Sequence, residues 1–142
     1  MKRRTAWMVV LLLAVGLIGV SSAQKARMNT YLSTLQKKMS AMVQAGESCK
    51  VNLNDSTDGD GMDAEIRLTM GIKEFEAFAP VAALEAAGIP HKFPAVNIYL
   101  RHEGTGRVGR INFRDAEPLA AKYKAGDRQA AVEEMSAEIT WH

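Results

Sequence analysis

The fold is decided by the stretch CKVNLNDSTDGDGMDAEIRLTM, residues 49–70. Apolar and polar residues alternate at its start and again over its second half. Such alternation is typical of strands that bury one face, because successive side chains of a strand point to opposite sides. The middle is rich in Gly and Asp, which favour turns. The stretch therefore predicts a β-hairpin with a long loop at about 55–62. The apolar side of this hairpin consists of Cys49, Val51, Leu53, Ala64, Ile66, Leu68 and Met70.

The hairpin loop is acidic and raises the question of a calcium site. Counted from Asn54, it has Asp58, Gly59 and Glu65 at positions 5, 6 and 12, and so resembles in part the calcium loop of the EF-hand family. Its flanks alternate as strands, whereas an EF-hand loop lies between helices. Two hypotheses stay open, a solvated turn and a weak Ca²⁺ site of another geometry; no other cofactor is expected. The candidate calcium ligands are Asp55, Asp58 and Asp60.

A second hairpin is predicted between residues 96 and 113. Alternating runs at 96–101 and 108–114 flank the turn EGTG at 103–106, whose glycines can adopt positive φ. If both hairpins join one sheet with its apolar face covered, the opposite face is polar and mostly basic, offset by Glu65. This face either binds a ligand or is an ordinary solvated surface. An acidic partner for it, within the chain or in a dimer, is offered by the acidic loop or by the acidic tail with Glu133, Glu134 and Glu138. The candidate binding residues are Arg67, Tyr99, Arg101, Arg110 and Asn112.

Three further segments are predicted to be helical: 24–46, 73–88 and 115–139. In the first, apolar residues recur at spacings of 4, 3, 4 and 3, so this helix either faces the core or forms a seam with a partner helix. In the second, Pro80 predicts a kink or two short helices. The third has Asp115 as a candidate N-cap. The seam of the first helix consists of Met28, Leu32, Leu35, Met39 and Met42.

The C-terminal segment contains a break at Gly126-Asp127. Residues 119–135, LAAKYKAGDRQAAVEEM, resemble the middle of a tetratricopeptide repeat, with Gly126-Asp127 at the turn between its two helices. The resemblance occurs once, while a solenoid needs about three repeats or more to bury its faces. It therefore implies only a tight helix–turn–helix.

The order of these elements predicts an α+β fold. A helix, a hairpin, a helix, a second hairpin and a helical tail give the order α-ββ-α-ββ-α. A four-stranded antiparallel sheet made from the two hairpins, with the helices packed on one face, would bury every alternating apolar set.

The N-terminus predicts export. Lys2, Arg3 and Arg4 precede an apolar run at 7–20, and small residues lie before a possible cut at Gln24. This is the layout of a signal peptide over residues 1–23. The alternative is an uncleaved anchor, because the uncharged stretch 5–24 is just long enough to span a bilayer as a hydrophobic helix. Either hypothesis places residues 24–142 in the periplasm or outside the cell as a single domain.

The charge and the reactive residues narrow the function. Removing three basic residues of the N-terminus from the 18 in the chain leaves 15 against 16 acidic residues, a net charge of −1 for 24–142, which argues against nucleic acid as a partner. The single cysteine, Cys49, is either a small buried residue or a thiol that pairs between chains. His91, His102 and His142 are too scattered to suggest metal-ligand spacing.

These observations favour a small exported binding module of the cell envelope that is not an enzyme. Its partner would be an envelope protein or an anionic ligand such as a glycan or a lipid headgroup, and a homodimer is a further alternative. The alternatives are a structural subunit tethered to the membrane and, less favoured, an unrecognised hydrolase or thiol enzyme.

Overall fold

The computed structural model describes residues 21–142, so most of the predicted signal peptide or anchor lies outside the described residues. Within this range the chain is α+β, as predicted. None of its described helices is both long enough and apolar enough to span a bilayer. The helices are α2 (Ser22–Met42), α3 (Ile72–Gly88), α4 (Phe113–Lys124) and α5 (Arg128–Glu138), and the strands are β1 (Ser48–Asp55), β2 (Met62–Thr69), β3 (Ala95–His102), β4 (Val108–Asn112) and β5 (Thr140–Trp141).

The strands form one mixed sheet in the order β1-β2-β3-β4-β5. Both predicted hairpins are present, as the antiparallel pairs β1–β2 and β3–β4. The predicted four-stranded antiparallel sheet is wrong in two respects. First, β2 and β3 are parallel, because α3 carries the chain across the sheet from the end of β2 to the start of β3. Second, a fifth strand of only two residues pairs with β4, and it is too short to leave an alternating pattern.

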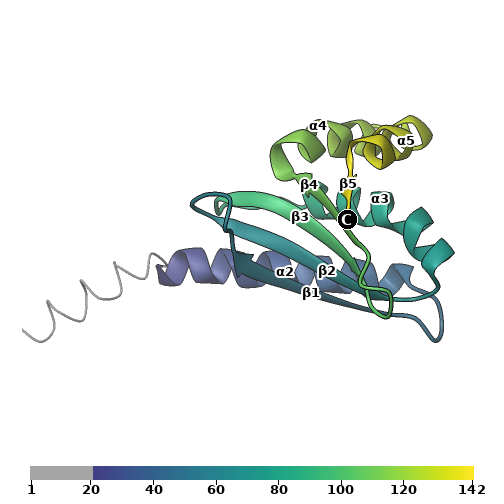
Figure 1. Cartoon of the computed structure of the whole chain (residues 1–142). Helices are drawn as coiled ribbons and strands as arrows, with labels where there is room; N and C mark the ends of the chain where they lie inside the picture. The colour runs from purple at the N-terminus through teal and green to yellow at the C-terminus, as the bar shows by residue number, and fades with distance from the viewer. Residues whose placement is uncertain (1–20) are drawn as a thin grey trace, which may run out of the picture.

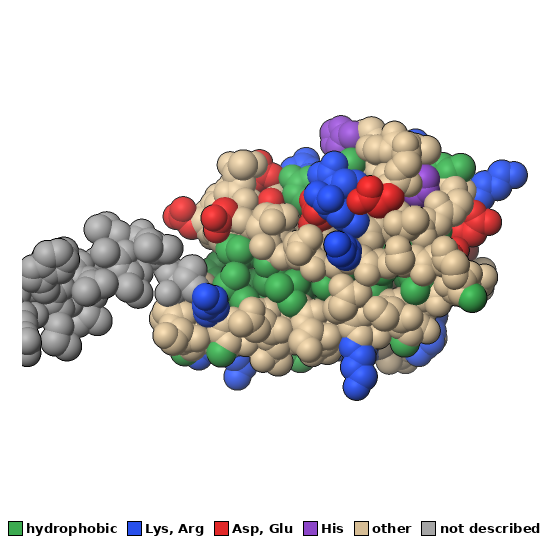
Figure 2. Space-filling model, turned by 90° about the horizontal axis from the view of Figure 1, so that it is seen from below, with side chains coloured by type: hydrophobic (Ala, Val, Ile, Leu, Met, Phe, Trp, Pro, Cys, Tyr) green, Lys and Arg blue, Asp and Glu red, His purple; other side chains and the backbone are tan. Residues whose placement is uncertain are grey.

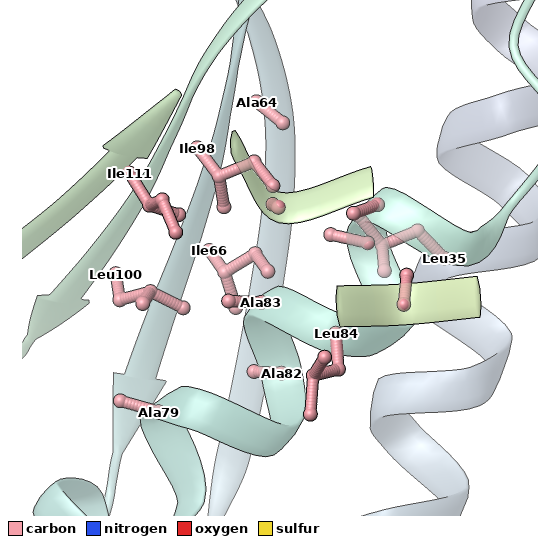
Figure 3. Packing of buried hydrophobic residues seen from close by; sticks show 14 of the residues in the cluster. Leu35, Ala64, Ile66, Ala79, Ala82, Ala83, Leu84, Ile98, Leu100 and Ile111 are labelled. Carbon is pink, nitrogen blue, oxygen red and sulfur yellow. The ribbon is translucent and has the colours of Figure 1, made fainter. Parts of the chain in front are cut away.

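The helices cover the apolar face of the sheet (Figure 1). In that view α2 runs along the β1 side, while α3, α4 and α5 gather toward β4 and β5. The close view of the core shows Ile66, Ile98 and Leu100 of the sheet facing the alanines of α3 (Figure 3). Since alanine is small, Ala79, Ala82 and Ala83 bring the helix backbone close to the strands, and all three are fully buried. Pro80 lies inside α3 without dividing it, so the chain forms one helix there.

Helix α2 is fixed to the outer edge of β1 by one glutamine. The side-chain amide of Gln36 donates to the carbonyl oxygen of Cys49 (2.9 Å), and its oxygen accepts from the backbone N–H of Val51 (3.1 Å). Gln36 thus makes the two bonds that a neighbouring strand would make. An edge strand leaves such groups unpaired, and covering them limits unwanted pairing with other chains.

The C-terminal helices confirm the predicted helix–turn–helix, but α4 begins earlier than expected. Its N-cap is Asn112, whose side chain accepts from the backbone N–H of Arg114 (3.1 Å), and the expected N-cap, Asp115, lies inside the first turn. The helix follows β4 directly, so the strand pattern hid its start. At the other end Gly126 has φ +108°, a left-handed conformation that glycine adopts at little cost.

Candidate functional site

The face of the sheet turned away from the helices carries a row of three cations. We define the open face as the polar side of β1–β4. Lys50 on β1 lies opposite Arg67 on β2, and Arg67 in turn lies beside Arg101 on β3. Neighbouring side chains on one face of a sheet are close enough to interact, and like charges placed directly opposite each other are destabilising. We call these three residues the cation row.

Two carboxylates compensate this row in part. Oε1 of Glu65 lies 2.6 Å from Nε of Arg67, and its Oε2 lies 3.5 Å from Nε of Arg101. The hydrogen bond to Glu65 raises the pKa of Arg67. Glu103, in the turn after β3, lies 3.7 Å from Nη1 of Arg67. Nε of Arg101 is buried and lacks a hydrogen-bond partner, and Lys50 makes no ion pair within residues 21–142. The positive charge of the row is therefore not fully neutralised.

The acidic loop folds onto the other half of the open face. Oδ2 of Asp58 accepts from the side-chain amide of Asn97 (2.7 Å) and lies 3.3 Å from Nη1 of Arg110. Asp63 also points to β3, where its Oδ1 accepts from the backbone N–H of Asn97 (3.0 Å). The face is thus divided into a half near β4 that the loop partners and a half near β1 that stays open.

The calcium candidates are not held together by this arrangement. Asp55 ends β1, Asp60 is exposed in the loop, and Asp58 is engaged by the side chains of β3 and β4. In the described part of the chain, no three His, Cys, Asp or Glu side chains are grouped so that they could hold a metal ion. Calcium binding stays a prediction from the sequence.

A hollow of about 450 Å³ lies at the β1 end of the open face. Ser48 is opposite Thr69 across β1 and β2, next to the pair formed by Lys50 and Arg67. Two hydroxyls therefore lie beside two cations, with Glu103 at the margin. The hollow is lined by Ser48, Cys49, Lys50, Arg67, Thr69 and Glu103.

All five predicted face residues lie on the polar side of the sheet: Arg67, Tyr99, Arg101, Arg110 and Asn112. Tyr99 lies between Glu65 and Arg110, its neighbours on β2 and β4. Asn112 lies at the end of β4 but uses its side-chain oxygen to cap α4. The acidic loop was predicted as a partner of this face, and Asp58 is the loop residue that contacts Arg110. Glu103 was not among the predicted binding residues, because it reaches the face from the turn after β3.

The predicted helix seam is divided between the core and the surface. Leu35 and Met39 are fully buried in this chain's own core, and Met28 and Leu32 are half-buried. Met42 is 38% exposed and lines a separate hollow of about 290 Å³ beside α3. Figure 2 shows the underside of the molecule, where an apolar strip runs between regions of charged side chains. The two buried seam residues are not available to a partner helix while the domain is folded.

Two of the histidines have structural partners. His91 lies in an aromatic cluster with Tyr31, Phe93 and Phe113, with Nε2 3.1 Å from Glu117 and Nδ1 3.0 Å from the carbonyl oxygen of Ile89. His102 is buried and lies 2.6 Å both from Thr105 and from the carbonyl oxygen of Met70. Each ring therefore ties a loop to the fold, with both nitrogens engaged.

Cys49 is expected to react slowly in the folded protein. Burial raises the pKa of its thiol to about 11, so at pH 8 the thiolate, which is the nucleophile, is rare. Because the thiolate fraction falls tenfold for each pKa unit, alkylation by iodoacetamide should be roughly 100-fold slower than for an unperturbed cysteine. Mass spectrometry over time measures this rate, and unfolding in urea should restore it. Alkylation at the rate of a free thiol before unfolding would contradict the expectation.

No family model, curated protein or solved structure was found to match this chain. The side chains of the open face indicate which kind of ligand it can bind. Guanidinium and ammonium groups donate charge-assisted hydrogen bonds to oxyanions, and Arg can do so in a bidentate manner.

Proposed function

We propose that residues 24–142 form an exported, non-catalytic binding module of the cell envelope, and that the open face binds an anionic ligand. The observation that carries the proposal is the cation row, formed by Lys50, Arg67 and Arg101 across three adjacent strands. Placing like charges in register lowers the stability of a sheet. Departures of this kind from what favours folding are expected at functional sites. The basic start and the apolar run of the N-terminus support export.

The other reactive groups support binding over catalysis. The Cys49 thiol is held protonated by burial, and the ring nitrogens of His91 and His102 are engaged by Glu117, by Thr105 and by two backbone carbonyl oxygens. The open face, in contrast, offers Tyr99 between charged neighbours, and Arg101 and Arg110 have side chains that are 39% and 40% exposed. Such groups can meet a ligand from solvent without rearranging the core.

Charge reversal on the open face tests the proposal. The double substitution Arg101→Glu and Arg110→Glu is expected to reduce retention on immobilised dextran sulfate at low salt by at least about tenfold, since each lost charge-assisted contact is worth ~1.5–3 kcal/mol. The matched control is Lys37→Glu with Lys73→Glu, which makes the same charge change at exposed positions of α2 and α3.

The control variant distinguishes an effect of the open face on retention from an effect of the protein's net charge. Equal loss of retention in the two double variants would mean that overall charge governs binding. Unchanged retention in the Arg101 and Arg110 variant would remove the open face as the binding surface. Circular dichroism of each variant checks that the fold is kept, because Arg110 also contacts Asp58.

A membrane-tethered structural subunit is the second candidate. Helix α2 begins at Ser22, directly after the apolar run, and its charged residues are all basic. If the apolar segment is retained, α2 would continue outward from the membrane. Intact-mass analysis of the exported protein distinguishes the two candidates, because a mass that begins at Gln24 excludes the anchor. The basic residues of α2 are Lys25, Arg27, Lys37 and Lys38.

A further inference from the structure

The hollow at the β1 end of the open face has the composition of an anion site. Its walls present the hydroxyls of Ser48 and Thr69 and the cations of Lys50 and Arg67. Resting on the proposed function, we propose that this hollow receives an oxyanion group of the ligand, a phosphate, sulfate or carboxylate. We further propose that Glu103 partners Arg67 there until the ligand displaces it.

The donors of the hollow are free to bind an anion. Arg67 uses Nε for its short contact with Glu65, while its Nη1 lies 3.7 Å from Glu103, which is beyond hydrogen-bond length. Its side chain is 45% exposed. Lys50 is exposed and makes no ion pair within the described range. An oxyanion between these two cations would relieve their repulsion, and its remaining oxygens could accept from the two hydroxyls.

Glu103 is placed to compete without obstructing the site. Its backbone N–H donates to the carbonyl oxygen of Leu68 (2.9 Å), and the neighbouring His102 is fixed to Met70 and Thr105. The backbone at Glu103 is therefore held, while its side chain is 47% exposed and can turn toward solvent without moving the backbone. Exposed ion pairs of this kind contribute little stability, so displacing the carboxylate requires little free energy.

The oxyanion of the ligand takes the place of the Glu103 carboxylate beside Arg67. Glu65 stays between Arg67 and Arg101, because its carboxylate is largely buried, with a side chain only 11% exposed. Glu103 is the exposed carboxylate of the hollow and so is the one that moves. Removing its charge should strengthen anion binding, whereas removing the charge of Lys50 should weaken it.

Titration of the exported protein with inorganic phosphate, followed by ¹H–¹⁵N NMR, tests this site. Phosphate should shift the amide signals around the hollow, namely those of Ser48, Lys50, Arg67, Thr69 and Glu103. Glu103→Gln should tighten phosphate binding by about 3- to 10-fold, since a nearby like charge disfavours the anion. Lys50→Ala should weaken it by a similar factor. The matched control, Glu133→Gln at an exposed position of α5, should leave the affinity unchanged.

Four outcomes would count against the anion site, against the competition by Glu103, or against the proposed function. Equal or weaker phosphate binding in Glu103→Gln would overturn the competition, and signal changes confined to other regions would overturn the site. If dextran sulfate depends on Arg101 and Arg110 but phosphate does not reach the hollow, the inference fails while the proposed function stands. If neither probe binds the open face, both fail.

Two further probes distinguish an oxyanion carried by a glycan from one carried by a lipid. Dextran sulfate and vesicles containing phosphatidylglycerol present the same anionic chemistry on a glycan and on a lipid surface. Glu103→Gln should tighten binding to the probe that resembles the natural ligand, and Lys50→Ala should weaken it. If neither substitution changed binding to dextran sulfate or to the vesicles, the hollow would not be part of the ligand site.

Discussion

Replacing Tyr31 with alanine is expected to lower the free energy of unfolding by about 3–5 kcal/mol, the cost typical of removing a buried aromatic ring. Tyr31 is 1% exposed and joins three parts of the structure. Its ring packs edge-on against Phe93 at 5.3 Å between centroids and lies 6.4 Å from Phe113 of α4. Its hydroxyl donates to the carbonyl oxygen of Ala86 in α3 (2.6 Å). Without the ring, α2 loses these contacts with α3, α4 and Phe93.

Tyr31→Phe is the matched control. It keeps the ring and removes only the hydrogen bond, so it should cost about 0.5–1.5 kcal/mol. Urea denaturation followed by circular dichroism measures both variants. If Tyr31→Ala cost no more than Tyr31→Phe, the ring would not be holding α2 to the core.

The wild type and Tyr31→Phe should also differ in how their stability depends on alkaline pH. Burial raises the pKa of Tyr31 well above its ordinary value of 10.0, so the unfolded chain ionises first. The stability linked to the protonated hydroxyl is complete below about pH 10 and is lost as the pH rises above it. Tyr31→Phe cannot ionise at this position, and its stability should fall less steeply above pH 10 than that of the wild type. Parallel curves would contradict this.

Gly109→Ala is expected to cost about 1–3 kcal/mol, the range typical of overpacking. A Cβ at this position would lie 2.8 Å from Cγ2 of Ile139 and 2.9 Å from Cζ3 of Trp141. The Trp141 ring cannot withdraw easily, because it contacts both the ring of Phe75 (5.8 Å between centroids) and the guanidinium of Arg107 (4.7 Å from the ring centroid). The added methyl should therefore loosen β5 from β4.

Gly59→Ala provides the control for this substitution. Gly59 lies in the acidic loop, where a Cβ would meet nothing within 4 Å, and its φ is not positive. It should leave the midpoint of urea unfolding unchanged. Tryptophan fluorescence should also respond in Gly109→Ala and not in Gly59→Ala. A Gly109→Ala protein as stable as the wild type would show that β5 tolerates displacement.

Much of the fold could be predicted because its signals are local. The alternation at 49–53 and 64–70 assigned both strands of the first hairpin, and the polar members of the alternation are those found on the open face. The start of α4 was placed too late because β4 runs directly into it. The fifth strand was missed because two residues are too few to show an alternating pattern. The α2 pattern showed an apolar seam but not its partner, which is this chain's own core.

The order of residues is enough to show which side chains share a face, since alternation follows from the geometry of each strand. It does not show which strands become neighbours or in which direction they run. The parallel pairing of β2 and β3 arises in the folded chain, because it depends on where α3 buries its alanine face. That pairing puts Arg101 beside Arg67 and so creates the cation row. The loops then bring Asp58 and Glu103 to the face, through contacts between residues far apart in the chain.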